Sequence, residues 1–255
     1  MARIPMVAGN WKMNTLRDDA IALARGIRAS SAGVTGVEIV LCPPFVYLND
    51  VRAAIDGSPL RLGAQNLHWE EKGAFTGEVS VTQVAEVADY VIIGHSERRQ
   101  YFGETDETVN RRVNAALAHG LKPIMCVGET LQQRQAGETD AVLVRQTRAG
   151  LDGVAVSQDF VIAYEPVWAI GTGLAADGAT AEQAISLIRR TVRDVAGSVA
   201  DAVRILYGGS VTPDNIAEFM AQPDIDGGLV GGASLKVDAF TGIIHAVAAS
   251  ATARA

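Results

Sequence analysis

Cysteine is scarce in this chain, which holds only Cys42 and Cys126 among its 255 residues. Two cysteines so far apart in the sequence form neither a metal-binding nor a redox motif, and they are too few for a disulfide scaffold. Long hydrophobic runs are also missing, because no uninterrupted apolar stretch reaches the roughly 18 residues of a membrane-spanning helix. The first ten residues lack the basic and apolar regions of a signal peptide. We therefore expect a cytoplasmic protein without a membrane partner.

Basic residues are in deficit, with 22 Lys and Arg against 29 Asp and Glu and a net charge of −7. A nucleic-acid-binding surface needs a basic excess, so we expect no nucleic-acid partner. Hydrophobic residues make up 48% of the chain, which is enough for a large core and excludes a disordered chain. No change of composition and no Gly/Ser/Pro-rich linker divides the sequence, so residues 1–255 are predicted to form one domain.

One pattern repeats along the whole chain: short apolar segments alternate with longer amphipathic segments. Arg17–Arg28, Thr105–His119 and Gln183–Val195 have the apolar spacing of helices. The short segments lack a polar alternation, which is typical of parallel strands covered on both faces. They are Met6–Ala8, Val37–Leu41, Arg61–Gly63, Tyr90–Ile93, Lys122–Val127, Phe160–Tyr164, Arg204–Tyr207 and Gly228–Val230.

Eight strand–helix units predict an α/β fold, a single closed (β/α)8 barrel whose active site lies at the C-terminal ends of the strands. The alternative is an open, doubly wound sheet. That fold would need a glycine fingerprint after the first strand, and Gly9–Asn14 does not provide one.

Chemically reactive side chains stand where the predicted strands end. Asn10 and Lys12 follow the first strand, His95 follows the fourth, and Glu165 follows the sixth. Each has an ordinary alternative, as a solvated lysine, a structural histidine or a salt-bridge partner, but their shared position favours one site. A carboxylate at the end of the apolar run Phe160–Tyr164 should be partly desolvated. Desolvation raises a carboxyl pKa and makes the group usable as a general base.

Two glycine turns follow the last two strands, Gly208-Gly209-Ser210 and Gly231-Gly232. In barrels of this type such turns commonly bind phosphate through backbone N–H groups, and glycine allows the close approach. Ordinary turn glycines are the alternative. The segment Pro166–Ala176 combines a stiff start, apolar residues and two glycines. It is predicted to be a lid that excludes water, although a long connection without motion would have the same composition.

These segments together resemble the triosephosphate isomerase family over essentially the whole chain. The residues that carry the resemblance are Gly9–Asn14, Gly63–Asn66, Gly73–Ser80, Gly94–Arg99, Cys126–Glu129, Ala163–Gly173, Tyr207–Ser210 and Leu229–Leu235. The resemblance implies a (β/α)8 TIM barrel that interconverts dihydroxyacetone phosphate and D-glyceraldehyde 3-phosphate through an enediol(ate). This reaction belongs to glycolysis and gluconeogenesis, and no metal or organic cofactor is expected.

The resemblance also implies a role for each site residue. Glu165 is expected to be the base, and His95 the neutral imidazole that polarises the carbonyl group. Lys12 and Asn10 are expected to bind the substrate, with Glu97 supporting Lys12. The phosphate is expected on backbone N–H groups of four residues, Gly171, Ser210, Gly231 and Gly232. Cys126 is expected to pack near the base.

A homodimer is expected, in which Thr76 of the loop Gly73–Ser80 approaches the partner's active site; a tetramer stays possible. The sequence departs from the family at two points. Gly228 replaces a larger residue, and the helix after the lid is capped by either Asp177 or Thr180. Two rival functions remain, an isomerase of another sugar phosphate and a scaffold protein that has lost catalysis.

Overall fold

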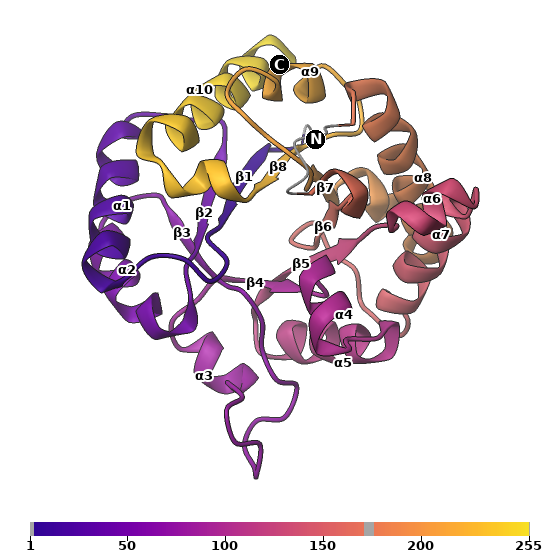
Figure 1. Cartoon of the computed structure of the whole chain (residues 1–255), viewed down its shortest axis with the longest axis horizontal. Coiled ribbons are helices and arrows are strands. Elements are labelled where there is room, and N and C mark those ends of the chain that lie inside the picture. The colour runs from indigo at the N-terminus through magenta and orange to yellow at the C-terminus, as the bar shows by residue number, and fades with distance from the viewer. Residues whose placement is uncertain (1–2, 171–175, 255) are drawn as a thin grey trace.

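Eight parallel strands close into a barrel in strict chain order in a computed structural model that describes residues 3–170 and 176–254. The strands lie in the centre of Figure 1, and the last strand pairs with the first, with Val7 opposite Gly228. The predicted (β/α)8 fold is therefore confirmed. The strands are β1 (Met6–Asn10), β2 (Glu38–Cys42), β3 (Arg61–Ala64), β4 (Tyr90–Ile93), β5 (Lys122–Val127), β6 (Val161–Tyr164), β7 (Arg204–Tyr207) and β8 (Gly227–Val230).

Helices form a ring around these strands (Figure 1). They are α1 (Arg17–Ser30), α2 (Leu48–Ile55), α3 (Val81–Ala85), α4 (Ser96–Phe102), α5 (Asp106–Ala118), α6 (Leu131–Gln135), α7 (Thr139–Gly150), α8 (Gly178–Ala196), α9 (Ile216–Met220) and α10 (Val237–Arg254). Short 3₁₀ turns occupy Phe45–Tyr47, Val167–Ala169, Gly197–Asp201 and Gly232–Leu235. Within residues 3–170 and 176–254, no helix is both long enough and apolar enough to cross a membrane.

The helix that follows the lid segment begins earlier than its apolar pattern predicts. The Oδ1 atom of Asp177 accepts the backbone N–H of Thr180 at 2.7 Å, so Asp177 is the N-cap of α8. This capping bond satisfies one of the free N–H groups of the first turn and fixes the start of the helix. The helix ends at Ala196, and the C-cap residue Gly197 has a φ of 70°.

The barrel interior is filled by side chains. One buried cluster gathers alternate strand residues such as Met6, Ala8 and Ile124, and a second packs the outer strand faces against the helices. At the N-terminal end, Tyr90 donates a hydrogen bond to Glu38 at 2.8 Å, and Arg204 pairs with the same carboxylate. The interior is therefore a packed core and not an open channel.

Candidate active site

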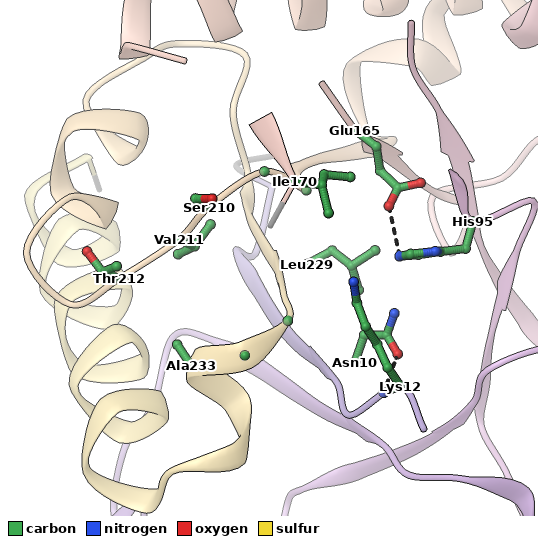
Figure 2. A pocket seen from close by; sticks show the side chains of 14 residues that line it. Asn10, Lys12, His95, Glu165, Ile170, Ser210, Val211, Thr212, Leu229 and Ala233 are labelled. Carbon is green, nitrogen blue, oxygen red and sulfur yellow. Dashed lines mark hydrogen bonds and ion pairs between the residues drawn. The ribbon is translucent and has the colours of Figure 1, made fainter. Parts of the chain in front are cut away.

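A cavity of about 290 Å³ opens at the C-terminal ends of the strands. Figure 2 shows its side chains, with Glu165 and His95 facing each other and Ser210 and Thr212 on the opposite side. The lining residues are Asn10, Lys12, His95, Glu165, Ile170, Gly208, Gly209, Ser210, Val211, Thr212, Leu229, Gly231, Gly232 and Ala233. The volume lies near the lower end for ligand pockets, so the cavity suits a small substrate.

The carboxylate of Glu165 is buried, with 2% of the residue exposed, and both of its oxygens have polar partners. Its Oε1 atom lies 2.9 Å from Nε2 of His95, and its Oε2 atom accepts the backbone N–H of Ser96 at 2.8 Å. The Ser96 hydroxyl donates to Oε1 at 3.3 Å. Glu165 follows β6 directly, so the rigid strand fixes the position of its backbone.

The pKa of Glu165 is lower than that of an ordinary glutamate. Burial raises this pKa, but the imidazole of His95 and the N–H of Ser96 stabilise the ionised form and together outweigh the burial. The expectation that desolvation raises this pKa is therefore wrong. A base that is already ionised at neutral pH can accept a proton without first losing one.

The imidazole of His95 is held at the N-terminus of α4. Its Nδ1 atom accepts the backbone N–H of Glu97 at 3.2 Å, which leaves Nε2 as the atom that faces Glu165. Burial lowers the pKa of His95, while the carboxylates of Glu165 and Glu97 raise it, and the balance lies above the ordinary value. The Nδ1 hydrogen bond fixes the neutral tautomer with its proton on Nε2.

The ammonium group of Lys12 lies beside the carboxylate of Glu97, with Nζ 2.5 Å from Oε1. Lys12 has a left-handed backbone, with φ at 52°. Its N–H donates to Oδ1 of Asn10 at 3.0 Å. Asn10 closes β1 and is 5% exposed, so a rigid strand supports both side chains.

The opposite wall of the cavity consists of glycine-rich backbone. A Cβ atom at Gly232 would meet no atom within 4 Å, and one at Gly231 would lie 3.7 Å from Cε of Lys12. The missing side chains leave open space next to the backbone, which allows an anion to approach the N–H groups. Gly209 is required for a different reason, because its Cβ atom would lie 2.3 Å from the Tyr207 hydroxyl oxygen.

The segment after Glu165 is tied to the barrel at both ends. Nε1 of Trp168 donates to Oε1 of Glu129 at 2.8 Å, and the Tyr164 hydroxyl donates to the same fully buried carboxylate at 3.1 Å. Beyond the segment, the N–H of Ala176 donates to the Tyr207 hydroxyl at 3.3 Å. These contacts fix where the predicted lid leaves and rejoins the barrel.

Seven of the predicted site residues line one cavity: Asn10, Lys12, His95, Glu165, Ser210, Gly231 and Gly232. Glu97 lies behind Lys12, and Cys126 is buried on β5. Thr76 is exposed on the loop after β3, which projects from the ring in Figure 1. Gly171 lies outside the described residues, as do residues 172–175 of the predicted lid.

Two residues near the base, Ser96 and Glu129, are not singled out by the sequence pattern. Ser96 directly follows His95, and Glu129 closes the segment Cys126–Glu129, so both stand inside segments that carry the family resemblance. No group of three or more His, Cys, Asp or Glu side chains able to hold a metal ion occurs in residues 3–170 and 176–254.

The fold and the cavity define a (β/α)8-barrel enzyme with a carboxylate, an imidazole and an ammonium group at its open end. The sequence profile described as Triosephosphate isomerase matches residues 5–247. Proteins named triosephosphate isomerase from Moorella thermoacetica and Chloroflexus aurantiacus are 53% and 54% identical to the chain. These matches cover 95% of this chain and 98% and 99% of the two relatives. The chain belongs to the triosephosphate isomerase family.

Proposed function

We propose that each group of residues in this cavity has a separate role in the isomerisation of a triose phosphate. The chain interconverts dihydroxyacetone phosphate and D-glyceraldehyde 3-phosphate in glycolysis, as members of its family do. The substrate carries one negatively charged phosphate group and one carbonyl group. The cavity offers a match for each, glycine backbone for the phosphate on one side and polar side chains for the carbonyl group on the other.

Glu165 abstracts the proton from the carbon next to the carbonyl group, and an enediolate forms. The same carboxyl group then returns the proton to the neighbouring carbon, which completes the isomerisation. Substrate binding must break the contact between Glu165 and Nε2 of His95, because each group then contacts the substrate instead of the other. The raising effect of Glu165 on the His95 pKa weakens at that point, while burial still lowers the pKa.

His95 then acts as a neutral imidazole that donates its Nε2 proton to the substrate oxygen and moves protons between the two oxygens. Lys12 and Asn10 stabilise the negative charge that develops on the same side. Donors that are already oriented stabilise an enediolate more than the ground-state ketone, and this difference lowers the barrier.

The backbone N–H groups of Ser210, Gly231 and Gly232 hold the phosphate, together with Gly171 of the segment Pro166–Ala176. Closure of that segment excludes water, which strengthens each electrostatic contact and protects the enediolate from losing phosphate. The residues that carry the reaction require no metal ion or organic cofactor.

The observation that carries these roles is the contact of 2.9 Å between Glu165 and His95 at the wall of a small cavity. The test is conversion of D-glyceraldehyde 3-phosphate by the purified protein with a chelator present, followed through NADH oxidation by a coupled dehydrogenase. Fast turnover that disappears in Glu165→Ala supports the roles. Unchanged turnover in Glu165→Ala would contradict the assignment of the base.

We also propose that the chain forms a homodimer through the loops that follow β1 to β4. These strands are neighbours in the barrel, and each is followed by an exposed large apolar residue: Met13, Val46, Phe75 and, after β4, Tyr101 and Phe102. Met13 is 96% exposed and Val46 is 76% exposed, which is unusual for apolar side chains on a monomer surface. Thr76 lies next to Phe75 and would reach the partner's site.

Analytical ultracentrifugation of Val46→Asp and Leu131→Asp tests this interface. Both residues are exposed and apolar, but Leu131 begins α6 after β5, outside the proposed face. Val46→Asp should shift the protein toward monomer and reduce turnover, while Leu131→Asp should leave the dimer intact. A dimer that survives Val46→Asp at micromolar concentration would contradict the assigned face.

Three further expectations belong to the same proposal. We place the protein in the cytoplasm, because both cysteines are free and buried in the described structure. We treat residues 1–255 as one domain, since all eight strands share one closed sheet. The net charge of −7 supports a protein without a nucleic-acid partner.

A further inference from the structure

The side chain of Gln65 connects the loop after β3 to the loop after β1 and to the last residue of β2. Gln65 follows β3, and its Nε2 atom donates to the carbonyl oxygen of Lys12 at 2.8 Å and to that of Cys42 at 2.9 Å. The first carbonyl belongs to the loop after β1, and the second ends β2. The segment Gly63–Asn66 is part of the family resemblance, yet none of its residues has a role so far.

Lys12 needs such support because its backbone is strained. A residue with a Cβ atom avoids a left-handed φ such as the 52° of Lys12, and it keeps that conformation only where its surroundings impose it. Both polar backbone atoms of Lys12 are held by side chains. Asn10 accepts the N–H, and Gln65 donates to the carbonyl oxygen.

The neighbouring residues tie the same loop to the barrel. The N–H of Trp11 donates to the carbonyl oxygen of Cys42 at 3.1 Å, and Nδ2 of Asn14 donates to that of Trp11 at 2.6 Å. The Cys42 oxygen therefore receives two donors, one from Trp11 and one from Gln65. Without the Gln65 amide, the carbonyl of Lys12 loses the contact that fixes the direction of its peptide group.

We infer that Gln65 is a positioning residue that aims the ammonium group of Lys12 into the active site. Gln65 is not among the residues that line the cavity, whereas Lys12 is, so Gln65 acts through Lys12 (Figure 2). The side chain of Lys12 leaves the strained backbone toward Oε1 of Glu97, and a rotation of the peptide group would move Nζ away from that place. This inference rests on the role proposed above for Lys12.

The first variant for the test is Gln65→Met, which keeps the length of the side chain and removes both hydrogen bonds. Displacement of a binding group by about 1 Å can cost roughly a hundredfold in rate, so kcat/KM should fall about 10- to 100-fold. The matched control is Asn110→Leu. Nδ2 of Asn110 also donates to two backbone carbonyls, those of Gly150 and Asp152, but far from the cavity. Asn110→Leu should keep kcat/KM within about twofold of the parent, since removed interactions that share no partner with the site act independently.

A double-mutant cycle then separates positioning from general destabilisation. In a Lys12→Met background there is no ammonium group left to position, so adding Gln65→Met should change kcat/KM less than about threefold. An equal loss in both backgrounds would overturn the inference, and so would normal kcat/KM in Gln65→Met alone. Circular dichroism checks the fold. If Gln65→Met does not fold, Gln65→Asn replaces it in the same cycle, since its amide is one methylene too short to reach both carbonyls.

The Lys12→Met variant also distinguishes two kinds of failure. If Lys12→Met itself retains full kcat/KM, the role proposed for Lys12 fails, and the inference about Gln65 falls with it. If Lys12→Met is strongly impaired but the effect of Gln65→Met is independent of it, the role of Lys12 stands and only the inference about Gln65 is overturned.

Discussion

Nε2 of His95 and Oε1 of Glu165 lie 2.9 Å apart, and both residues are buried. Each group therefore sets the protonation of the other. Glu165 raises the pKa of His95 and His95 lowers the pKa of Glu165, so the two groups titrate as a coupled pair in the ligand-free enzyme. A ligand that separates them changes both equilibria at once.

The titration of His95 should reveal this coupling directly. In the ligand-free chain its pKa should lie above the ordinary 6.5, because the carboxylates hold the proton to higher pH. Glu165→Gln removes the strongest raising influence while burial still lowers the pKa, so the value should fall. Imidazole NMR signals can follow this change, since the chain has only four histidines. A pKa that stays constant or rises in Glu165→Gln would contradict the coupling.

Shortening the base by one methylene should affect catalysis far more than binding. Glu165→Asp draws the carboxylate away from the substrate carbon and from Ser96, so kcat should fall by about a hundredfold or more. KM should stay close to the parent value, because the phosphate contacts remain. Steady-state kinetics check both quantities. The control is Glu218→Asp, because Glu218 accepts the Gly178 N–H at the start of α8 and does not line the cavity. If the kcat of Glu165→Asp is close to that of Glu218→Asp, Glu165 is not the base.

Removal of the Glu129 carboxylate should destabilise the fold. Glu129→Leu removes the acceptor of the Tyr164 hydroxyl and of the Trp168 indole N–H, at a cost of about 3 kcal/mol for the two lost hydrogen bonds. The apparent melting temperature, measured at one fixed protein concentration, should drop by roughly 6–12 °C. Trp168→Phe removes a donor together with its bond and leaves Tyr164 paired, so its melting temperature should drop less. Equal drops in the two variants would contradict this account.

Substitution by alanine should have different effects on stability at the two adjacent glycines of β8. Gly227 has a φ of 134°, and a Cβ atom there would lie 1.8 Å from the Met6 carbonyl oxygen in the strand pair that closes the barrel. Gly227→Ala should therefore cost more than about 4 kcal/mol or prevent folding. Gly228 has only ordinary contacts at 3.6 Å and beyond, so Gly228→Ala should be neutral or stabilise by up to about 1 kcal/mol. Chemical denaturation measures the free energy of unfolding of both variants. Similar values for the two would contradict the prediction.

The strand ends were the most predictable part of this molecule. Asn10, Lys12, His95 and Glu165 could be grouped from the sequence, because the carboxyl ends of parallel strands in a closed barrel meet on one rim. The apolar runs also located the strands closely. The first strand extends beyond its apolar core to Asn10, since pairing with Cys42 continues through polar residues.

Contacts between loops could not be predicted in the same way. The lowered pKa of Glu165 depends on the Ser96 N–H and on His95, and neither distance follows from sequence spacing. Burial alone predicts the opposite sign. Gln65 donates to backbone carbonyls of other units, and Glu129 accepts from aromatic side chains of the next unit. The residue types alone do not single out either residue.

The pairing of β1 with β8 makes the two ends of the chain depend on each other. The cavity draws residues from loops after β1, β4, β6, β7 and β8, so no shorter run of units brings all of its walls together. The active site is therefore complete only when β8 of the last strand–helix unit has paired with β1 of the first. We therefore expect a nascent chain to stay inert at least until its last strand has emerged and the ring can close.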